Sequence, residues 1–266
     1  NRTGEQYEER TIVEYEYHKG RDHKIPLEFY KDYKGVLVTD GLQQYHLIDK
    51  LLPDVTNANC WAHARRDFSD AVKAADKKNP ESVRRSIAYQ ALQKIAEFYN
   101  ADTELKDFTS AERLQIRQTK IKPLVEDFFV WVKKQAAECA VPPKSKTAQG
   151  LNYIINQEVY LKAFLTDGDV PIDNSASERS IRTFCIGKKN WMFHNTAKGA
   201  SASALVYSIS ETAKLNNLRP YNYFKYILTE LPKHCDEKGN IEPAALDYLM
   251  PWSDALPEEC RKPRRL

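Results

Sequence analysis

The first seventy residues alternate between strand-like and helix-like patterns of apolar and polar positions. Segment 10–18, RTIVEYEYH, has the period of two that is typical of a half-buried strand, with one side formed by Thr11, Val13, Tyr15 and Tyr17. GVLVTD (35–40) is a compact apolar run that predicts a second strand, and helical segments are expected on either side of it, at 25–33 and 43–52. DVTNANCWAHARRDF (54–68) predicts a weaker strand through Cys60 and a helix from about Ala62. Strands that alternate with helices favour an α/β sheet.

From residue 64 to about 165 the pattern is almost wholly helical. Two amphipathic stripes predict core positions, namely Val83, Ile87, Ala91, Leu92, Ile95 and Tyr99, and then Ile121, Leu124, Val125, Phe128 and Val132. The paired prolines of AVPPKSK (140–146) end this series, and a further helix is expected near 147–164. A long helical block therefore interrupts an α/β beginning.

The end of the chain predicts two helices and a tail. SASALVYSISETAKLN (201–216) and PYNYFKYILTELP (220–232) both read as helices, and Pro220 suits a first-turn position. We expect the second helix to bury Tyr221, Phe224, Leu228 and Leu231. The proline-rich tail after Lys233 is expected to wrap around the protein or to fray.

Composition narrows the class of protein only a little. A chain of 266 residues can hold one large domain or two small ones, and 40 Lys and Arg against 37 Asp and Glu give a mild net charge of +3. The five scattered cysteines form no Cys-x-x-Cys pair, which suits unbridged thiols in a reducing compartment. Neither a secretory signal nor an apolar run of transmembrane length is present, so we expect a soluble cytoplasmic protein, and the start at Asn1 suggests a piece of a longer chain.

Asp40 is the first candidate for chemistry. It ends the apolar run 35–40, so its carboxylate is expected at the carboxyl edge of a buried strand, where ligands gather in open α/β sheets. Asp and Gly are also favoured in turns, and Asp caps helices. On the residues alone, the ordinary turn is the better interpretation of TDG.

Glu178 is the second candidate, and it also has a structural explanation. Ser175-Ala-Ser-Glu178 has the form of a capping box, in which Ser175 and Glu178 satisfy each other's backbone N–H groups. A helix from about Ser175 also sets Glu178, Ile181, Arg182 and Cys185 on one face. That mixed face is unusual for solvent, although the cap alone explains the acid.

A basic run follows Glu178. Between Arg179 and Lys198 there are five basic residues and no acid, and the aromatic residues Phe184, Trp191 and Phe193 lie among them. Cations for phosphates and rings for unpaired bases suit a nucleic-acid surface. A charged hairpin with its aromatic side chains folded inward is the alternative.

Cys60 and His63 have a Cys-x-x-His spacing, but no second ligand pair follows. A helix start that packs Trp61 inward therefore explains them better than structural zinc.

Four blocks carry a resemblance to a known family. VTDGLQQY, CWAHARRDF, PIDNSASERSIRTFCIGKKNW and SISETAKLNNLRPYNYFKYILTELP, in this order, strongly resemble the transposases of the insertion sequence 66 family. The resemblance runs from about Val13 to LMPW near the end of the chain. It implies an α/β, ribonuclease H-like fold, in which three acidic residues hold Mg²⁺ or Mn²⁺. Asp40 matches the second acid and Glu178 the third, and Cys60 and His63 resemble a motif that shapes the site.

The resemblance also implies how the chain is organised. Residues 1–63 correspond to the first part of the catalytic domain, without its opening strand, and residues 64–165 to a helical insertion. Residues 166–200 correspond to the second part of that domain, with the Glu178 helix and a basic hairpin. The C-terminal helices (201–232) and an irregular tail (233–266) complete the chain.

The implied activity is metal-dependent cleavage at transposon ends, followed by attack of the new 3′-hydroxyl on target DNA. The expected DNA contacts are Arg65, Arg66, Arg179, Arg182, Lys188, Lys189, Asn190, Trp191 and Lys198. We expect the whole protein to act as a homo-oligomer in the bacterial cytoplasm, associated with the nucleoid, with accessory proteins of the same element as further partners.

One departure from the family pattern concerns the first acid, which no residue of this chain matches. We therefore expect a C-terminal piece of a transposase that is inactive alone. Two alternatives stay open at this point, a DNA-binding remnant without catalysis and a metal-dependent nuclease of the same fold that only hydrolyses DNA.

Overall fold

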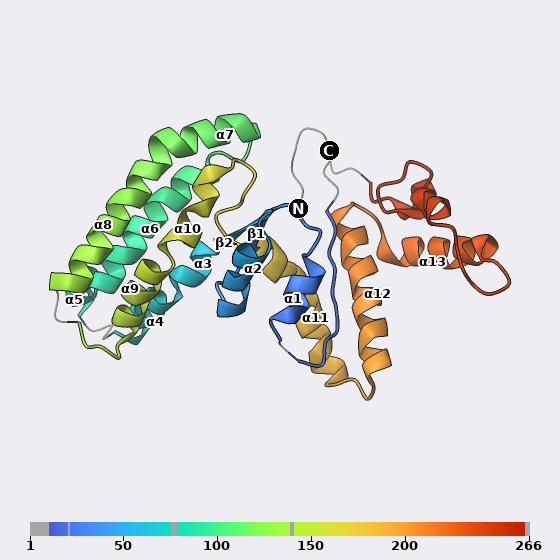
Figure 1. Cartoon of the computed structure of the whole chain (residues 1–266), viewed down its shortest axis with the longest axis horizontal. Helices are drawn as coiled ribbons and strands as arrows, with labels where there is room; N and C mark the ends of the chain where they lie inside the picture. Colours follow the sequence, from blue (N-terminus) through green and yellow to red (C-terminus); the bar gives the residue numbers. More distant parts are fainter. Residues whose placement is uncertain (1–10, 21, 76–78, 139–140, 264–266) are drawn as a thin grey trace. The chain divides into compact units, whose positions relative to one another are not determined.

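The chain forms two compact units, which are described separately (Figure 1). The sheet unit comprises residues 21–176, and the terminal unit comprises residues 1–20 and 177–266. The structure is a computed structural model that describes residues 11–20, 22–75, 79–138 and 141–263. No helix within these ranges is both long and apolar enough to cross a membrane.

A short parallel sheet lies at the start of the sheet unit. Strands β1 (Gly35–Thr39) and β2 (Val55–Asn59) pair in parallel, with Gly35 opposite Val55 and Thr39 opposite Asn59. The crossover between them consists of η1 (Gln43–Leu47) and α2 (Ile48–Leu51), and α1 (Lys24–Phe29) precedes β1. The predicted strands and the α/β character of this segment are thus present. Within the described residues the sheet has only these two strands, and the chain is mostly helical.

The helical block follows β2 directly and confirms the predicted pattern. Its members are α3 (Trp61–Ala64), α4 (Arg66–Ala74), α5 (Pro80–Arg85), α6 (Ile87–Thr103), α7 (Ser110–Ile116), the π turn η2 (Arg117–Ile121), α8 (Lys122–Glu138), α9 (Lys146–Asn156), α10 (Glu158–Lys162) and η3 (Ala163–Thr166). The two predicted stripes supply core residues, which include Ala91, Ile95, Ile121, Val125, Phe128 and Val132. The helix expected near 147–164 is divided into α9, α10 and η3.

Trp61 lies at the centre of the core that joins β2 to the helical block. Its fully buried ring packs against Phe98, Phe128 and Phe129 from α6 and α8, with ring centroids 4.7 to 6.0 Å apart. Its indole Nε1 donates to the carbonyl of Leu161, 2.8 Å away. The sheet and the helices therefore share one apolar core.

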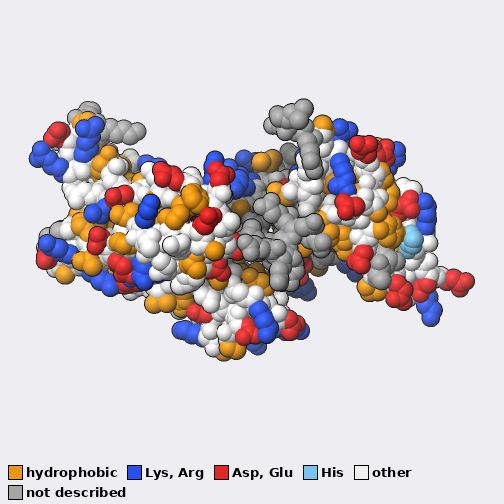
Figure 2. Space-filling model, turned by 90° about the horizontal axis from the view of Figure 1, so that it is seen from above, with side chains coloured by type: hydrophobic (Ala, Val, Ile, Leu, Met, Phe, Trp, Pro, Cys, Tyr) orange, Lys and Arg blue, Asp and Glu red, His pale blue; other side chains and the backbone are white. Residues whose placement is uncertain are grey.

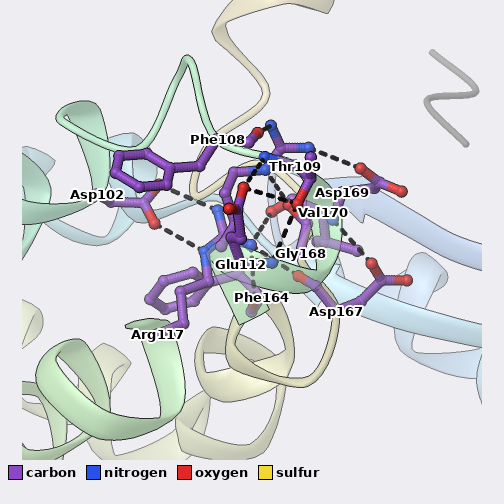
Figure 3. A network of polar contacts seen from close by, with 11 residues as sticks. Asp102, Phe108, Thr109, Glu112, Arg117, Phe164, Asp167, Gly168, Asp169 and Val170 are labelled. Carbon is purple, nitrogen blue, oxygen red and sulfur yellow. Dashed lines mark hydrogen bonds and ion pairs between the residues drawn. The ribbon is translucent and has the colours of Figure 1, made fainter. Parts of the chain in front are cut away.

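A buried arginine fixes the segment by which the chain leaves the helical block (Figure 3). Arg117 is 3% exposed, and its Nε and Nη2 donate to the carboxylate of Asp102 at 2.7 and 3.1 Å. Its Nη1 donates to the carbonyls of Phe164, Asp167 and Val170 at 2.7 to 3.0 Å. A bidentate pair with these extra acceptors satisfies a guanidinium that is otherwise costly to bury.

Arg113 holds the same segment from the preceding turn. Its Nε donates to the carbonyl of Gly168, and its Nη2 forms an ion pair with Asp169, both at 2.7 Å. A Cβ at position 168 would lie 1.9 Å from the carbonyl oxygen of Ser110, so only glycine fits there. The two arginines thus fix the chain immediately before the segment that contains Glu178.

In its described residues the terminal unit contains three α-helices, namely α11 (Ser175–Trp191, which begins in the sheet unit), α12 (Ala197–Leu215) and α13 (Pro220–Glu230). The run is therefore helical from Arg179 to Trp191 of α11, where a basic hairpin was expected, and it then passes through an irregular segment at 192–196 to Lys198 of α12. The helical preference of this run prevails because no Pro or Gly breaker stands between Glu178 and Ile186, and Gly187 is accommodated within the helix.

The strand expected at 10–18 is also absent from the described residues, and Arg10 lies outside them. The segment is extended, but its backbone is bound by side chains of α12 and not by another strand. The amide of Val13 donates to Thr212 Oγ1 at 3.0 Å, and the amide of Tyr15 donates to Ser208 Oγ at 2.8 Å. Hydroxyl groups on a helix therefore take the place of a β ladder.

The buried face of α13 differs from the expected one. Tyr221 and Leu228 are 80% and 66% exposed, whereas Tyr223 is buried against Ala213 and Leu256. The tail explains this choice, because it packs on the Tyr223 side of the helix.

The tail itself forms η4 (Leu231–His234), η5 (Pro243–Leu249) and η6 (Glu258–Cys260), and it wraps as expected, with an antiparallel bridge between Leu218 and Arg261. Cys60, Cys185, Cys235 and Cys260 are unbridged, and Cys139 lies outside the described residues.

Loss of the Arg117 side chain should destabilise the sheet unit strongly. In Arg117→Met the carboxylate of Asp102 stays buried without its partner, so we expect the free energy of unfolding to fall by about 3–5 kcal/mol. Arg85→Met is the matched control, because it removes an exposed ion pair with Glu81 and should cost less than about 1 kcal/mol. Equilibrium urea unfolding measures both, and equal losses in the two variants would contradict the assignment.

Candidate functional site

Asp40 lies where it was expected, directly after β1 at the carboxyl edge of the sheet. Its Oδ1 accepts a hydrogen bond from the amide of Leu42 at 3.2 Å, and Gly41 between them has a φ of +82°. The predicted turn is therefore present. Oδ2 accepts no hydrogen bond from the residues that the structure describes, so the half-buried carboxylate keeps an oxygen for a ligand.

A buried polar ladder supports this turn. The hydroxyl of Thr39 donates toward Asn57 Oδ1 at 3.1 Å and Asn59 Oδ1 at 3.4 Å, and all three residues are at most 5% exposed. The same hydroxyl oxygen accepts from the amide of Gly41 at 3.3 Å. Buried polar groups of this kind are satisfied only in one arrangement, so the ladder fixes the backbone next to Asp40.

The helical block reaches the same edge through α9. The hydroxyl of Tyr153 donates to the carbonyl oxygen of Asp40. The two oxygen atoms are 3.5 Å apart, which is the limit of hydrogen-bond distance. A Cβ at Gly41 would lie 2.3 Å from that phenolic oxygen. Gln157, which follows α9, accepts from the Asn59 amide at 2.9 Å. The turn of Asp40 therefore lies between the polar ladder and the end of α9.

A third contact comes from α10. The ring of Tyr160 stacks on His46 of η1, with centroids 4.3 Å apart and planes 3° apart. The sequence interpretation missed Tyr153, Gln157 and Tyr160. Their spacing of four and three along one helical face was the available signal, but nothing local to them shows what that face contacts.

The groups around Asp40 are neutral at physiological pH. Burial raises the pKa of Tyr153 to about 12, and the charge of Asp40 adds to this effect. Burial lowers the pKa of the His46 imidazole, which the hydrogen bond with Asn59 opposes only in part. Neither Tyr153 nor His46 therefore offers a cation to the carboxylate of Asp40.

Cys60 is a buried, protonated thiol that connects two segments. Burial raises the pKa of its thiol, and the side chain is 0% exposed. Its amide donates to the carbonyl of Thr39 at 2.9 Å, and its Sγ accepts from the amide of Asn174 at 3.4 Å. His63 is half-buried on α3. Across the described parts of the chain, no three His, Cys, Asp or Glu side chains gather as metal ligands.

Asp173 is a further residue that the sequence interpretation missed. Its Oδ1 accepts from the amide of Ser175 at 2.9 Å, and its Oδ2 accepts from the Tyr99 hydroxyl at 3.3 Å. Burial, with the charge of Asp173, raises the pKa of Tyr99. The guanidinium of Arg65 lies over the Tyr99 ring, 5.7 Å from its centroid. Asp173 therefore holds the first residue of α11 against α6.

Glu178 lies in the first turn of α11, with an exposed side chain. A carboxylate near a helix N-terminus is favoured by the helix dipole. Ile181, Arg182 and Cys185, which were predicted on the same face, are also exposed. Glu178 belongs to the terminal unit and Asp40 to the sheet unit, and each is described within its own unit.

The basic and aromatic side chains of the run separate from each other. The exposed members of the predicted DNA-contact set are Arg65, Arg66, Arg179, Arg182, Lys188, Lys189, Asn190 and Lys198. Trp191 is half-buried and packs against Phe184 and His194, at 5.3 and 4.2 Å between centroids. Phe193, in contrast, is 72% exposed. The aromatic side chains of the run are therefore packed inward at Phe184 and Trp191 but not at Phe193.

Comparisons with known proteins match nearly the whole chain. The family described as "Transposase IS66 family" matches residues 2–202, and the "IS66 C-terminal element" matches residues 208–252. Among curated proteins, the uncharacterized protein y4hP of Sinorhizobium fredii is 28% identical over 236 residues, which are 85% of this chain and 41% of that protein.

A second relative from the same organism, the uncharacterized protein y4qI, is 28% identical over 249 residues, which are 91% of this chain and 43% of that protein. The chain thus spans about two fifths of the length of these curated relatives. No solved structure matches the chain.

Gly41→Ala should reveal the contact between α9 and the Asp40 turn. The added methyl would clash with the Tyr153 hydroxyl, and alanine is strained at the positive φ of this position. We therefore expect a loss of about 2–4 kcal/mol in the free energy of unfolding. Gly239→Ala is the control, because Gly239 has a φ of +80° and no atom within 4 Å of an added Cβ. It should lose only about 1–2 kcal/mol.

Tyr153→Phe removes the atom that the new methyl would meet. In the Tyr153→Phe background we expect Gly41→Ala to lower the free energy of unfolding by at least about 1 kcal/mol less than it does in the unmodified chain. A double-mutant cycle of urea unfolding measures this difference. Additive losses would show that Tyr153 does not limit the space at Gly41.

Proposed function

This chain belongs to the IS66 family of transposases, and from that premise we propose that it carries part of a DNA transposase active site in a ribonuclease H-like catalytic domain. In this site Asp40 and Glu178 together hold a divalent cation, Mg²⁺ or Mn²⁺. The observation that carries the proposal is the carboxylate of Asp40 at the carboxyl edge of β1, with one oxygen that accepts no hydrogen bond within the described chain.

The segment before α11 supports the participation of Glu178. Asn174 and Ser175 are held in the sheet unit, by Cys60 Sγ and by the carboxylate of Asp173 respectively. Glu178 follows Ser175 by three residues in the same helix, which is less than one helical turn. In this proposal the contacts of Cys60 and Asp173 are positioning contacts for the third acid of the family pattern.

The donor set fits a hard cation better than a soft one. Carboxylate oxygens are the ligands that Mg²⁺ and Mn²⁺ prefer. Cys60 presents a protonated, buried thiol, and thiolates are what zinc sites require. A neutral His46 beside the turn leaves the negative charge of Asp40 unopposed.

A cation of this kind, when bound, polarises a phosphodiester and activates water at neutral pH. The chain's own residues then have separate tasks. The ladder of Thr39, Asn57 and Asn59 and the hydroxyl of Tyr153 keep the Asp40 turn in one conformation, so that the carboxylate is oriented in advance. The exposed cations of α11 bind phosphates of the scissile strand. In the whole protein, water cuts the transposon end, and the freed 3′-hydroxyl attacks target DNA.

The partner in this proposal is DNA, and the basic surface of α11 is its main contact. On the face shown in Figure 2, Lys and Arg side chains are intermixed with Asp and Glu. A local run of cations, and not the mild net charge of +3, therefore accounts for the affinity. No residue of this chain matches the first acid of the family pattern, so we propose that the chain alone lacks strand transfer.

A double-mutant cycle on Mn²⁺ affinity tests whether Asp40 and Glu178 share one cation. If they do, Asp40→Asn and Glu178→Gln should each lower the affinity at least about tenfold, and the double variant should lose little more than either. Asp32→Asn and Glu237→Gln, both exposed acids, are the matched controls and should leave it unchanged. Free Mn²⁺ is measured by electron paramagnetic resonance. Strictly additive losses, or losses equal to those of the controls, would refute a shared site.

The basic surface of α11 is tested by DNA binding. Lys188→Gln with Lys189→Gln should weaken binding of a labelled duplex and lower the slope of log affinity against log salt by about 1–2, because each phosphate contact contributes about 0.9. Lys225→Gln with Lys238→Gln makes the same change of charge at other exposed positions of the terminal unit. Fluorescence anisotropy over a salt series measures both, and identical slopes in the two variants would contradict a role for α11.

A further inference from the structure

A basic pocket lies in the terminal unit, where the tail meets the turn between α12 and α13. Its volume is about 620 Å³, and its lining includes Asn216, Asn217, Arg219, Glu258, Arg261 and Lys262. We call it the basic pocket. The DNA contacts that the sequence predicted, from Arg65 to Lys198, are all outside it.

Backbone pairing builds this pocket from segments that are distant in the sequence. The amide of Arg219 donates to the carbonyl of Cys260 at 2.7 Å, and the amide of Lys262 donates to the carbonyl of Asn217 at 2.9 Å. Leu218 and Cys260 between them are fully buried. The positions of Arg219 and Lys262 therefore follow from a paired backbone on an apolar anchor, and not from two flexible loops.

The charge in the pocket is unbalanced. The described lining residues include three cations, Arg219, Arg261 and Lys262, and one carboxylate, Glu258, which gives 3 − 1 = +2 for this set. None of these three cations has a carboxylate within 4.0 Å in the part of the chain that the structure describes. Arg261 donates through one nitrogen to the carbonyl of Ser253 at 2.7 Å, which orients its guanidinium and leaves further N–H groups for a ligand.

Other features of the pocket point to an anion with several acceptor oxygens. Helix α13 has 11 residues and begins directly after Arg219, so its positive end is near that side chain. Asn216 and Asn217 add neutral amide groups to the lining. Pro263 is the one apolar residue among the described lining residues, so the lining offers no cluster of apolar side chains to a peptide ligand.

We propose that the basic pocket binds a phosphate group, and that its source in the whole protein is the sugar-phosphate backbone of DNA. The second part rests on the proposed function, because it takes DNA as the partner. The pocket then gives the C-terminal element a second phosphate contact, separate from α11. Tetrahedral phosphate oxygens match the guanidinium and amide donors, and Lys262 adds a point charge.

The test uses Arg219→Gln with Lys262→Gln, which removes two exposed cations and keeps Arg261, because its bond to Ser253 also supports the fold. Inorganic pyrophosphate is the first probe, measured by isothermal titration, and a labelled duplex is the second, measured by anisotropy over a salt series. Lys225→Gln with Lys238→Gln is the control of equal charge. Circular dichroism melting checks that all variants fold alike.

We expect the pocket variant to lose at least about fivefold in pyrophosphate affinity and about three- to tenfold in DNA affinity, with a salt slope lower by about 1–2. The control should change neither beyond the effect of net charge. Pyrophosphate is titrated without Mg²⁺ or Mn²⁺ and without DNA, so that readout does not depend on the metal site, and a failure of the metal site is distinguishable from a failure of this pocket.

Two results would overturn the pocket itself, namely no pyrophosphate binding by the unmodified chain, or equal binding by the pocket variant and the control. Loss of pyrophosphate binding with unchanged DNA affinity and salt slope would overturn DNA as the source and assign the pocket to a free phosphoanion.

Discussion

The buried pair of Arg117 and Asp102 is the constraint on which the arrangement of the sheet unit depends. A guanidinium that is 3% exposed must have its donors satisfied, and only the carbonyls of Phe164, Asp167 and Val170 complete the set. The chain must therefore leave the helical block along one path. That path leads to residues 172–175, where the carbonyl of Ile172 accepts from the amide of Trp61 and the amide of Asn174 donates to Cys60 Sγ, just after the end of β2.

The helical block consequently shares its core with the sheet and contributes side chains to the sheet edge. Trp61 sits at the end of β2, yet its ring is buried by Phe98, Phe128 and Phe129 of the block. The block in turn contributes Tyr153 and Gln157 to the surroundings of the Asp40 turn. Because a shared core transmits any shift of packing, a change deep in the helices should alter the turn as well.

The pattern of apolar and polar residues correctly predicted the features that depend on neighbouring residues in the sequence. β1, β2 and the buried stripes of α6 and α8 follow from apolar periodicity, and Asp40 follows from its place at the end of a strand. The expected strand at 10–18 was wrong, because its backbone partners are hydroxyls of Thr212 and Ser208, about two hundred residues away. Likewise α13 carries two possible apolar faces, and only the tail decides that Tyr223 is buried. Gln157 and Asp173 act through tertiary contacts that no short motif encodes.

Helix α11 shows why the basic run supported two interpretations at once. Phe184 and Trp191 are seven residues apart and therefore lie on one face, where Phe184 packs against Tyr15 and Tyr207 as well as Trp191. The exposed cations lie on the rest of the helix. The period of 3.6 thus separates the rings, which stabilise the unit, from the charges, which face solvent. In the proposed DNA contact such a surface would bind phosphates much more than bases, since Phe193 is the one exposed ring among the three aromatic side chains of the run.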